Sequence, residues 1–204
     1  MLSLSKWSYI IEIPSSGNLE ADVISLLTAN SKQEVAEHCL AVAKISEEIA
    51  ARFGLDVLTA RNAALLHDIS SIMEAPDMLD LAINRGWELH ESERKYPFLL
   101  HQRVSVIFAK ELLGVDSDIV LSAIECHTTL REKPSDYDMV LFIADKLSWV
   151  QNGQPPFYDA VASAAEKSLE GSALAYIRFI LDNGMVLSPH KWLLEAKSWL
   201  EKQG

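Results

Sequence analysis

Apolar residues recur every three or four positions along most of the chain, the pattern of amphipathic helices. One such stripe runs from about Lys32 to Phe53, and Gly54 is placed to end that helix. A second helix is expected to begin after Asp56, a residue type that favours the N-cap position, and to end near Ile69. The first part of the chain after residue 31 is therefore predicted to form two consecutive α-helices.

The same spacing of apolar residues predicts helices through the rest of the chain. Pro97 and Ser117 suit the starts of two of them, and a Ser188-Pro189 pair suits the start of the last. The expected ranges are 78–84, 97–114, 118–127, 138–145, 158–169 and 173–182, with a final helix after Pro189. No sustained alternation of apolar and polar residues occurs beyond residue 31, so the pattern predicts an all-α fold.

The first thirty residues differ in pattern from the rest of the chain. Residues 7–13 are β-leaning, residues 14–17 break regular structure, and residues 19–27 have helical periodicity. We therefore expect residues 1–30 to be an N-terminal accessory segment and residues 31–150 to be the core domain. Residues 151–204 are expected to form a C-terminal helical extension packed on that core.

Composition and charge narrow the classes of partner. The 204 residues are 49% hydrophobic and 23% charged, the balance of a globular domain. A formal net charge of -11 opposes a nucleic-acid or anionic-membrane partner, and no apolar run approaches the roughly 20 residues of a membrane span. The start of the sequence lacks the pattern of a secretory signal. We expect a cytoplasmic protein with a small-molecule partner, and a homodimer is one option for its assembly.

Five ionisable residues lie on the apolar faces of separate predicted helices. A lone inward histidine is more often a satisfied core residue than a ligand. Five such positions together favour a metal site, because isolated polar groups are costly in an apolar interior and converging helices can share one metal centre. The five residues are His38, His67, His101, His127 and Asp145.

The two cysteines and the two remaining histidines lie outside this pattern. Cys39 and Cys126 each adjoin a candidate histidine, but successive helical residues point about 100° apart, so we expect both to be small buried core residues. His90 and His190 have no companion in the sequence pattern, and we expect exposed or structural roles for them.

The order of the motifs resembles the HD superfamily of metal-dependent phosphohydrolases, named for an adjacent His-Asp pair. Here that pair is His67-Asp68, within Ala-Ala-Leu-Leu-His-Asp-Ile. The flanking residues of His101, His127 and Asp145 are similar to the YqeK-type branch, whose members are symmetrical diadenosine tetraphosphate hydrolases. The resemblance covers roughly residues 31–150 and implies an HD-domain helical bundle.

The resemblance also implies a two-metal centre in which Asp68 bridges the ions and His67 and Asp68 are catalytic. One ion would be held by His38, His67, Asp68 and Asp145, and the second by His101 and His127 together with Asp68. Mixed imidazole and carboxylate ligands suit iron, manganese or zinc, and the family favours iron. Two such ions can acidify a bridging water to hydroxide for in-line attack on phosphorus. Attack at the centre of diadenosine tetraphosphate would release two ADP.

The chain departs from the branch at two expected cations. Ser71 stands where the branch usually has Lys, and Val35 stands where it usually has Arg. Leu130 also replaces a Gly, and the residues after Asp145 differ from the usual run. The candidate replacements for substrate binding are Lys146, Arg103, Arg61, Arg131 and the hydroxyl of Thr128.

Three alternatives stay open from the sequence. The substrate could be another nucleotide, such as a mononucleotide or guanosine tetraphosphate. The domain could instead be a metal-containing nucleotide sensor without turnover. A purely helical interaction protein would bind no metal, which metal analysis distinguishes from the other two.

Overall fold

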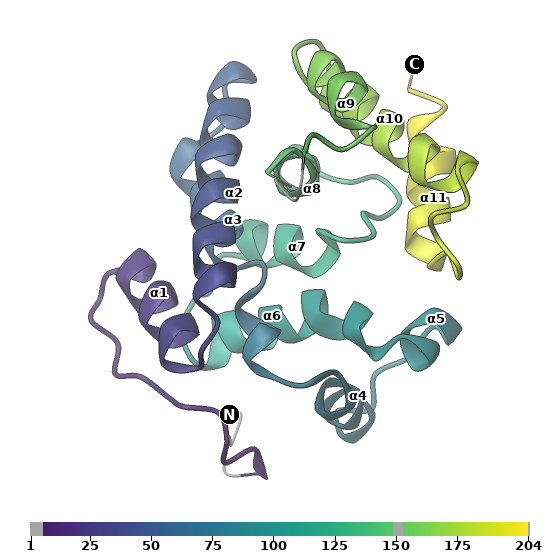
Figure 1. Cartoon of the computed structure of the whole chain (residues 1–204). Coiled ribbons are helices and arrows are strands. Elements are labelled where there is room, and N and C mark those ends of the chain that lie inside the picture. The colour runs from purple at the N-terminus through teal and green to yellow at the C-terminus, as the bar shows by residue number, and fades with distance from the viewer. Residues whose placement is uncertain (1–5, 149–152, 204) are drawn as a thin grey trace.

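The computed structural model describes residues 6–148 and 153–203 (Figure 1). Within these ranges every regular element is helical, which confirms the predicted all-α class. Two short 3₁₀ helices, Ile69–Ile72 and Pro97–Leu100, join longer elements. The α-helices are α1 (Leu19–Ala29), α2 (Gln33–Arg52), α3 (Val57–Leu66), α4 (Ala75–Asn84), α5 (Glu91–Lys95), α6 (His101–Glu111), α7 (Asp118–Cys126), α8 (Asp136–Leu147), α9 (Tyr158–Ala165), α10 (Leu169–Asp182) and α11 (Lys191–Leu200).

Helix α8 lies at the centre of the bundle (Figure 1). It packs against α2, α3 and α7, which precede it in the sequence, and against α9 and α10, which follow it. Its six consecutive residues from Met139 to Ala144 are all buried. A helix that is apolar around its whole circumference must be enclosed by others, so this run explains why α8 is central.

Polar side chains start several of these helices as the sequence predicts. The Asp56 carboxylate accepts a hydrogen bond from the Thr59 N–H at 2.7 Å, and the Ser117 hydroxyl accepts one from the Val120 N–H at 3.5 Å. Gly54 comes just after α2 with φ of 69°, a left-handed conformation that glycine adopts without strain. The predicted end of α2 and the predicted starts of α3 and α7 are confirmed.

Several predicted boundaries are wrong. Helix α3 ends at Leu66 rather than near Ile69, and the chain continues into a 3₁₀ turn. The break predicted between residues 169 and 173 lies earlier: α9 ends at Ala165 rather than at Leu169, and the Ser168 hydroxyl accepts the Gly171 N–H and starts α10 at Leu169 rather than at Ala173. The cap therefore sets the start of α10 several residues earlier than the hydrophobic pattern indicates.

The β-leaning segment at residues 7–13 does not form a strand in the structure. Trp7 and Ile10 are buried, so the segment packs on the domain through its side chains. The backbone of Ile11 is paired by a side chain, since its N–H and carbonyl both bond the Asn30 amide at 2.8 Å. The Asn30 amide thus satisfies the backbone of one residue of this segment in the way that a neighbouring strand would.

The remaining sequence expectations concern burial and boundaries. Cys39 and Cys126 are both buried and unpaired, as predicted. In the part of the chain that the structure describes, no helix is both long and apolar enough to cross a bilayer. The boundary between residues 150 and 151 falls outside the described residues, and the division into three segments stays a prediction.

Candidate metal centre

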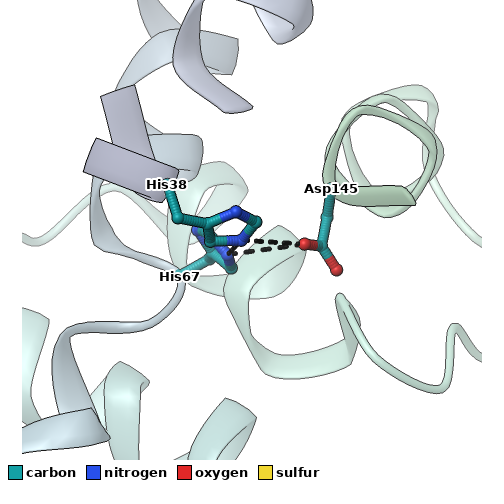
Figure 2. A group of neighbouring side chains, drawn as sticks. All are labelled: His38, His67 and Asp145. Carbon is teal, nitrogen blue, oxygen red and sulfur yellow. Dashed lines mark hydrogen bonds and ion pairs between the residues drawn. The ribbon is translucent and has the colours of Figure 1, made fainter. Parts of the chain in front are cut away.

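The predicted ligands come from helix ends and helix middles that meet in one place. His38 lies within α2 and Asp145 within α8, and both side chains point toward His67 at the end of α3 (Figure 2). His127 comes directly after the last residue of α7, and His101 is the first residue of α6. The structure thus brings all five inward residues, together with Asp68, into a single cluster.

One half of the cluster surrounds the Nε2 atoms of His38 and His67, which lie 3.3 Å apart. The Asp145 Oδ1 atom is 3.1 Å from the His38 Nε2 and 3.8 Å from the His67 Nε2. The Asp68 Oδ2 atom is 3.4 Å from the His67 Nε2 and 3.9 Å from the His38 Nε2. Ligands about 2.1 Å from one ion lie about 3.0–3.4 Å from one another, so these atoms could hold a metal.

The other half of the cluster surrounds the second carboxylate oxygen of Asp68. This Oδ1 atom lies 3.5 Å from the Nε2 atoms of both His101 and His127. The two Nε2 atoms are 2.9 Å apart. Asp68 therefore directs one oxygen toward each pair of histidines, the arrangement that a bridging carboxylate would have.

Backbone carbonyls fix the orientation of three of the imidazoles. The Nδ1 atoms of His67, His101 and His127 lie 2.7, 2.6 and 2.8 Å from the carbonyl oxygens of residues 64, 98 and 124. Each Nδ1 must donate to its carbonyl, which leaves Nε2 of the neutral ring as an acceptor. The His101 and His127 acceptors then face each other at hydrogen-bond distance. A metal ion held by both Nε2 atoms would use these two acceptors, and the contacts at Nδ1 are those of metal-binding imidazoles.

The electrostatics of the cluster favour the metal-binding forms of several groups. Burial lowers the pKa of His127 to about 4, even though its hydrogen bond to Asp68 opposes the change. Burial alone would raise the pKa of Asp68, but His67 and its neighbours outweigh it and hold that pKa well below the ordinary value. Burial alone would also raise the pKa of Asp145, but the positive charge of Lys146 is the main effect that outweighs burial, and the pKa is lowered. Both carboxylates are ionised and His127 is neutral at pH 7.

His67 behaves differently from His127. Burial would lower its pKa, but the adjacent Asp68 carboxylate and the Cys39 thiol together outweigh burial and raise the pKa well above its ordinary value. A proton on His67 thus neutralises part of the buried negative charge, a task that a metal cation would also perform.

A cavity of about 690 Å³ opens beside the cluster. Glu34, Val35 and Glu37 line it from α2, with the two exposed glutamates at its rim, and Thr128, Lys146 and Ser148 line another part. Tyr176 of α10 also lines the cavity. Tyr176 was not predicted from the sequence, because it lies beyond the region of family resemblance and no pattern links it to the histidines.

The candidate substrate-binding residues fall into two groups. Thr128 and Lys146 line the cavity, and the Thr128 Oγ1 lies 3.1 Å from the His101 Nε2. The three arginines are not among the described residues that line it. Arg61 pairs with Glu20 and Glu47, Arg103 with Glu93, and Arg131 with Glu125 and Asp138.

His90 and His190 lie outside the cluster and have structural roles, as expected. Each accepts a backbone N–H at Nδ1 and so caps a helix, His90 at α5 and His190 at α11. The sequence pattern did not indicate that they are neighbours, yet their ring centroids are 4.6 Å apart. This contact joins the segment before α6 to the C-terminal helix.

The sequence and the fold of this chain are similar to those of known proteins. A family model for the HD domain matches residues 35–150. An uncharacterized protein in the pepC 5' region of Lactococcus lactis subsp. cremoris is 40% identical over 141 residues, which are 69% of this chain and 72% of that protein. A symmetrical bis(5'-nucleosyl)-tetraphosphatase of Bacillus subtilis (strain 168) is 26% identical over 177 residues, 83% of this chain and 92% of the relative.

A solved structure shows the same fold. It is described as a predicted HD superfamily hydrolase involved in NAD metabolism from Clostridium acetobutylicum. It superposes with a TM-score of 0.80 at 26% identity, covering 94% of this chain and all of the other. Since the family model spans more than half of the chain and the fold agrees, this chain belongs to the HD domain family.

Proposed function

We propose that this chain is a metal-dependent phosphohydrolase that cleaves a nucleotide phosphoanhydride. The observation that carries the proposal is the position of Asp68, which directs one oxygen toward His38 and His67 and the other toward His101 and His127. A carboxylate between two sets of imidazole donors suits a pair of divalent ions.

The proposed ligands are assigned from these distances. His38, His67 and Asp145 would hold one ion and His101 and His127 the other, with Asp68 shared. Iron is our first choice, and the donor set also suits manganese or zinc. When bound, two such ions would activate the attacking water and neutralise the charge that develops on phosphorus. Asp68 and His67 would act directly at the reacting centre, because the Asp68 carboxylate lies between the two halves of the cluster and the His67 Nε2 is 3.4 Å from its Oδ2 atom.

The first proposed substrate is diadenosine tetraphosphate, with two ADP as products. The relatives in Bacillus subtilis and Halalkalibacterium halodurans named symmetrical bis(5'-nucleosyl)-tetraphosphatase support this choice. The hydroxyl of Thr128 lines the cavity beside His101 and can donate a hydrogen bond to a phosphate oxygen. The ammonium of Lys146 lines the same cavity but is already bonded to Asp145.

A mononucleotide is the second candidate substrate, because of the charge of the cavity. Among its described lining residues Lys146 is the single Lys or Arg, whereas Glu34 and Glu37 stand on the α2 rim. A tetraphosphate brings more negative charge to this rim than a monophosphate does, which favours the smaller anion. Product analysis separates the two candidates.

The test begins with the metal content of the purified protein and continues with a nucleotide panel. We expect about two divalent ions per chain and, with iron or manganese supplied, release of two ADP from diadenosine tetraphosphate. Release of inorganic phosphate from a nucleoside monophosphate, in which a phosphoester bond rather than a phosphoanhydride is broken, would instead support the second candidate. A chain that binds no stoichiometric metal would refute both candidates, and a metal-loaded chain that turns over no nucleotide would indicate a sensor.

Asp68→Asn tests the role of the shared carboxylate with little change in shape. We expect turnover to fall by at least about a thousandfold, because the amide cannot supply two anionic oxygens. Asp22→Asn is the matched control, since Asp22 is another buried carboxylate and lies on α1, away from the cluster. Equal turnover of the two variants would contradict the role of Asp68.

A further inference from the structure

We propose that Lys146 is a positioning residue that competes with a bound metal for Asp145. This role rests on the proposed metal-dependent function. Lys146 would have two effects. Its hydrogen bond turns one oxygen of Asp145 toward the histidines, and its positive charge lowers the affinity of the site for a divalent ion. Lys146 would thus act on Asp145 rather than on the substrate.

The contacts of Asp145 divide its two oxygens between two directions. Oδ1 lies 3.1 Å from the His38 Nε2 and 3.8 Å from the His67 Nε2 (Figure 2). Oδ2 accepts a hydrogen bond from the Lys146 ammonium. With one oxygen occupied by Lys146, only the other faces the imidazoles, so the carboxylate is oriented to bind a single ion through one oxygen.

The position of Lys146 is fixed from several sides. Its ammonium also lies 3.4 Å from the carbonyl oxygen of His127, to which it donates. The same Nζ is 5.2 Å from the ring centroid of Phe142 and 5.7 Å from that of Tyr176, distances at which aromatic faces attract a cation. Lys146 therefore ties α8, which carries Asp145, to the end of α7, which carries His127.

Burial shows that Lys146 is not an ordinary surface cation. The residue is only 6% exposed, and lysine is almost never buried at this level unless its charge is paired. Its paired anion is Asp145, whose side chain is 14% exposed. Without a metal, Lys146 compensates the Asp145 charge, and removing either partner would leave an uncompensated buried ion.

A metal at Oδ1 changes this balance. Two cations then share one carboxylate and repel each other in a partly desolvated site, where charge interactions are stronger than in water. A neutral side chain at position 146 would remove that repulsion from the metal-bound state. It would also remove the compensating charge from the metal-free state, and both changes favour metal binding.

The test is a Mn²⁺ titration of the metal-free full chain and of Lys146→Met, which keeps the length of the side chain without its charge. We expect Lys146→Met to bind Mn²⁺ at least about tenfold more tightly and, without metal, to unfold at a lower temperature than the wild type. Lys146→Arg keeps the positive charge, and its Mn²⁺ affinity is expected to be close to that of the wild type. Lys44→Met, at an exposed position in α2, controls for the change in net charge and is expected to leave the affinity unchanged.

Other outcomes would overturn the inference. Unchanged or weaker Mn²⁺ binding by Lys146→Met contradicts it, and an accompanying rise in the KM for nucleotide would assign Lys146 to the substrate instead. If Lys146→Met does not fold, Lys146→Gln carries the same prediction, because its amide can still bond Asp145. A wild-type chain that binds no Mn²⁺, iron or zinc would refute the proposed function itself, whereas a metal-binding, active wild type with an unaltered Lys146→Met affinity refutes this inference alone.

Discussion

Replacing His190 by Asn should remove a pH-dependent part of the stability of this protein. The His190 side chain is 7% exposed, and its Nδ1 accepts the N–H of Trp192 at 3.2 Å, which caps α11. Only a neutral imidazole can accept that bond. Burial lowers the pKa of His190, and His90 and Arg103 add to the effect, although Glu93 opposes it.

The lowered pKa sets the direction of the pH dependence. The unfolded chain binds a proton on His190 near pH 6.5, whereas the folded chain binds it only at lower pH, so acidification favours unfolding. This contribution to stability is fully present above pH 6.5 and is lost as the pH falls through the folded pKa. Protonation breaks the capping hydrogen bond, which contributes about 1 kcal/mol to stability. It also places a positive charge at a helix N-terminus, which costs about 0.3–1 kcal/mol.

The expected loss is therefore about 1–2 kcal/mol, or about 2–8 °C in Tm for a domain of this length. Thermal unfolding of metal-loaded protein between pH 8 and pH 5 measures it. Asparagine is also a good N-cap and does not titrate, so His190→Asn should match the wild type at pH 8 and exceed it in Tm at pH 5. His190→Ala should lose the cap at every pH. A Tm difference between the Asn variant and the wild type that stays constant with pH would refute this reasoning.

Three further predictions concern the core, the cavity and the metals. Phe108 is fully buried, so Phe108→Ala should lower the free energy of unfolding by about 3–5 kcal/mol in chemical denaturation, and a loss below about 1 kcal/mol would contradict the observed packing. Thr128→Val should raise the KM for nucleotide about 10–100-fold in steady-state kinetics, because the proposed hydrogen bond to a phosphate oxygen would be lost. The control Arg61→Met, which removes ion pairs to Glu20 and Glu47, should leave KM unchanged. Removal of metal by a chelator should lower the Tm, since an ion present at about a hundred times its Kd stabilises the folded state by about 2.7 kcal/mol, and an unchanged Tm would indicate that no ion is bound.

The helices and the inward direction of the histidines were predictable because both depend on local periodicity. His38 and Asp145 lie on the apolar faces of long helices, where a spacing of three and four residues identifies the buried side. Capping residues such as Asp56 and Ser117 marked helix starts for equally local reasons. These properties need only the few residues on either side.

Asp68 shows where local reasoning fails. Adjacent helical residues point about 100° apart, so His67 and Asp68 could not both have been placed on one face by periodicity, and the family resemblance supplied the second residue. In the structure α3 has already ended, and Asp68 has φ of -113° and ψ of 15°. Leaving the helix allows both side chains of the pair to reach the same cluster.

The surroundings of the cluster depended on contacts between distant parts of the chain. Arg61 and Arg103 were candidates because they are close in sequence to ligands, but Glu20, Glu47 and Glu93 bind them elsewhere. Lys146 and Tyr176 meet beside the cavity although they belong to different helices. The amino-acid pattern was enough to predict the helices and the buried side of each, because hydrogen bonding and periodicity act over a few residues. Only the packing of α2, α3, α6, α7 and α8 decided that six donor side chains lie within a few ångströms of one another, because such distances depend on how separate helices cross.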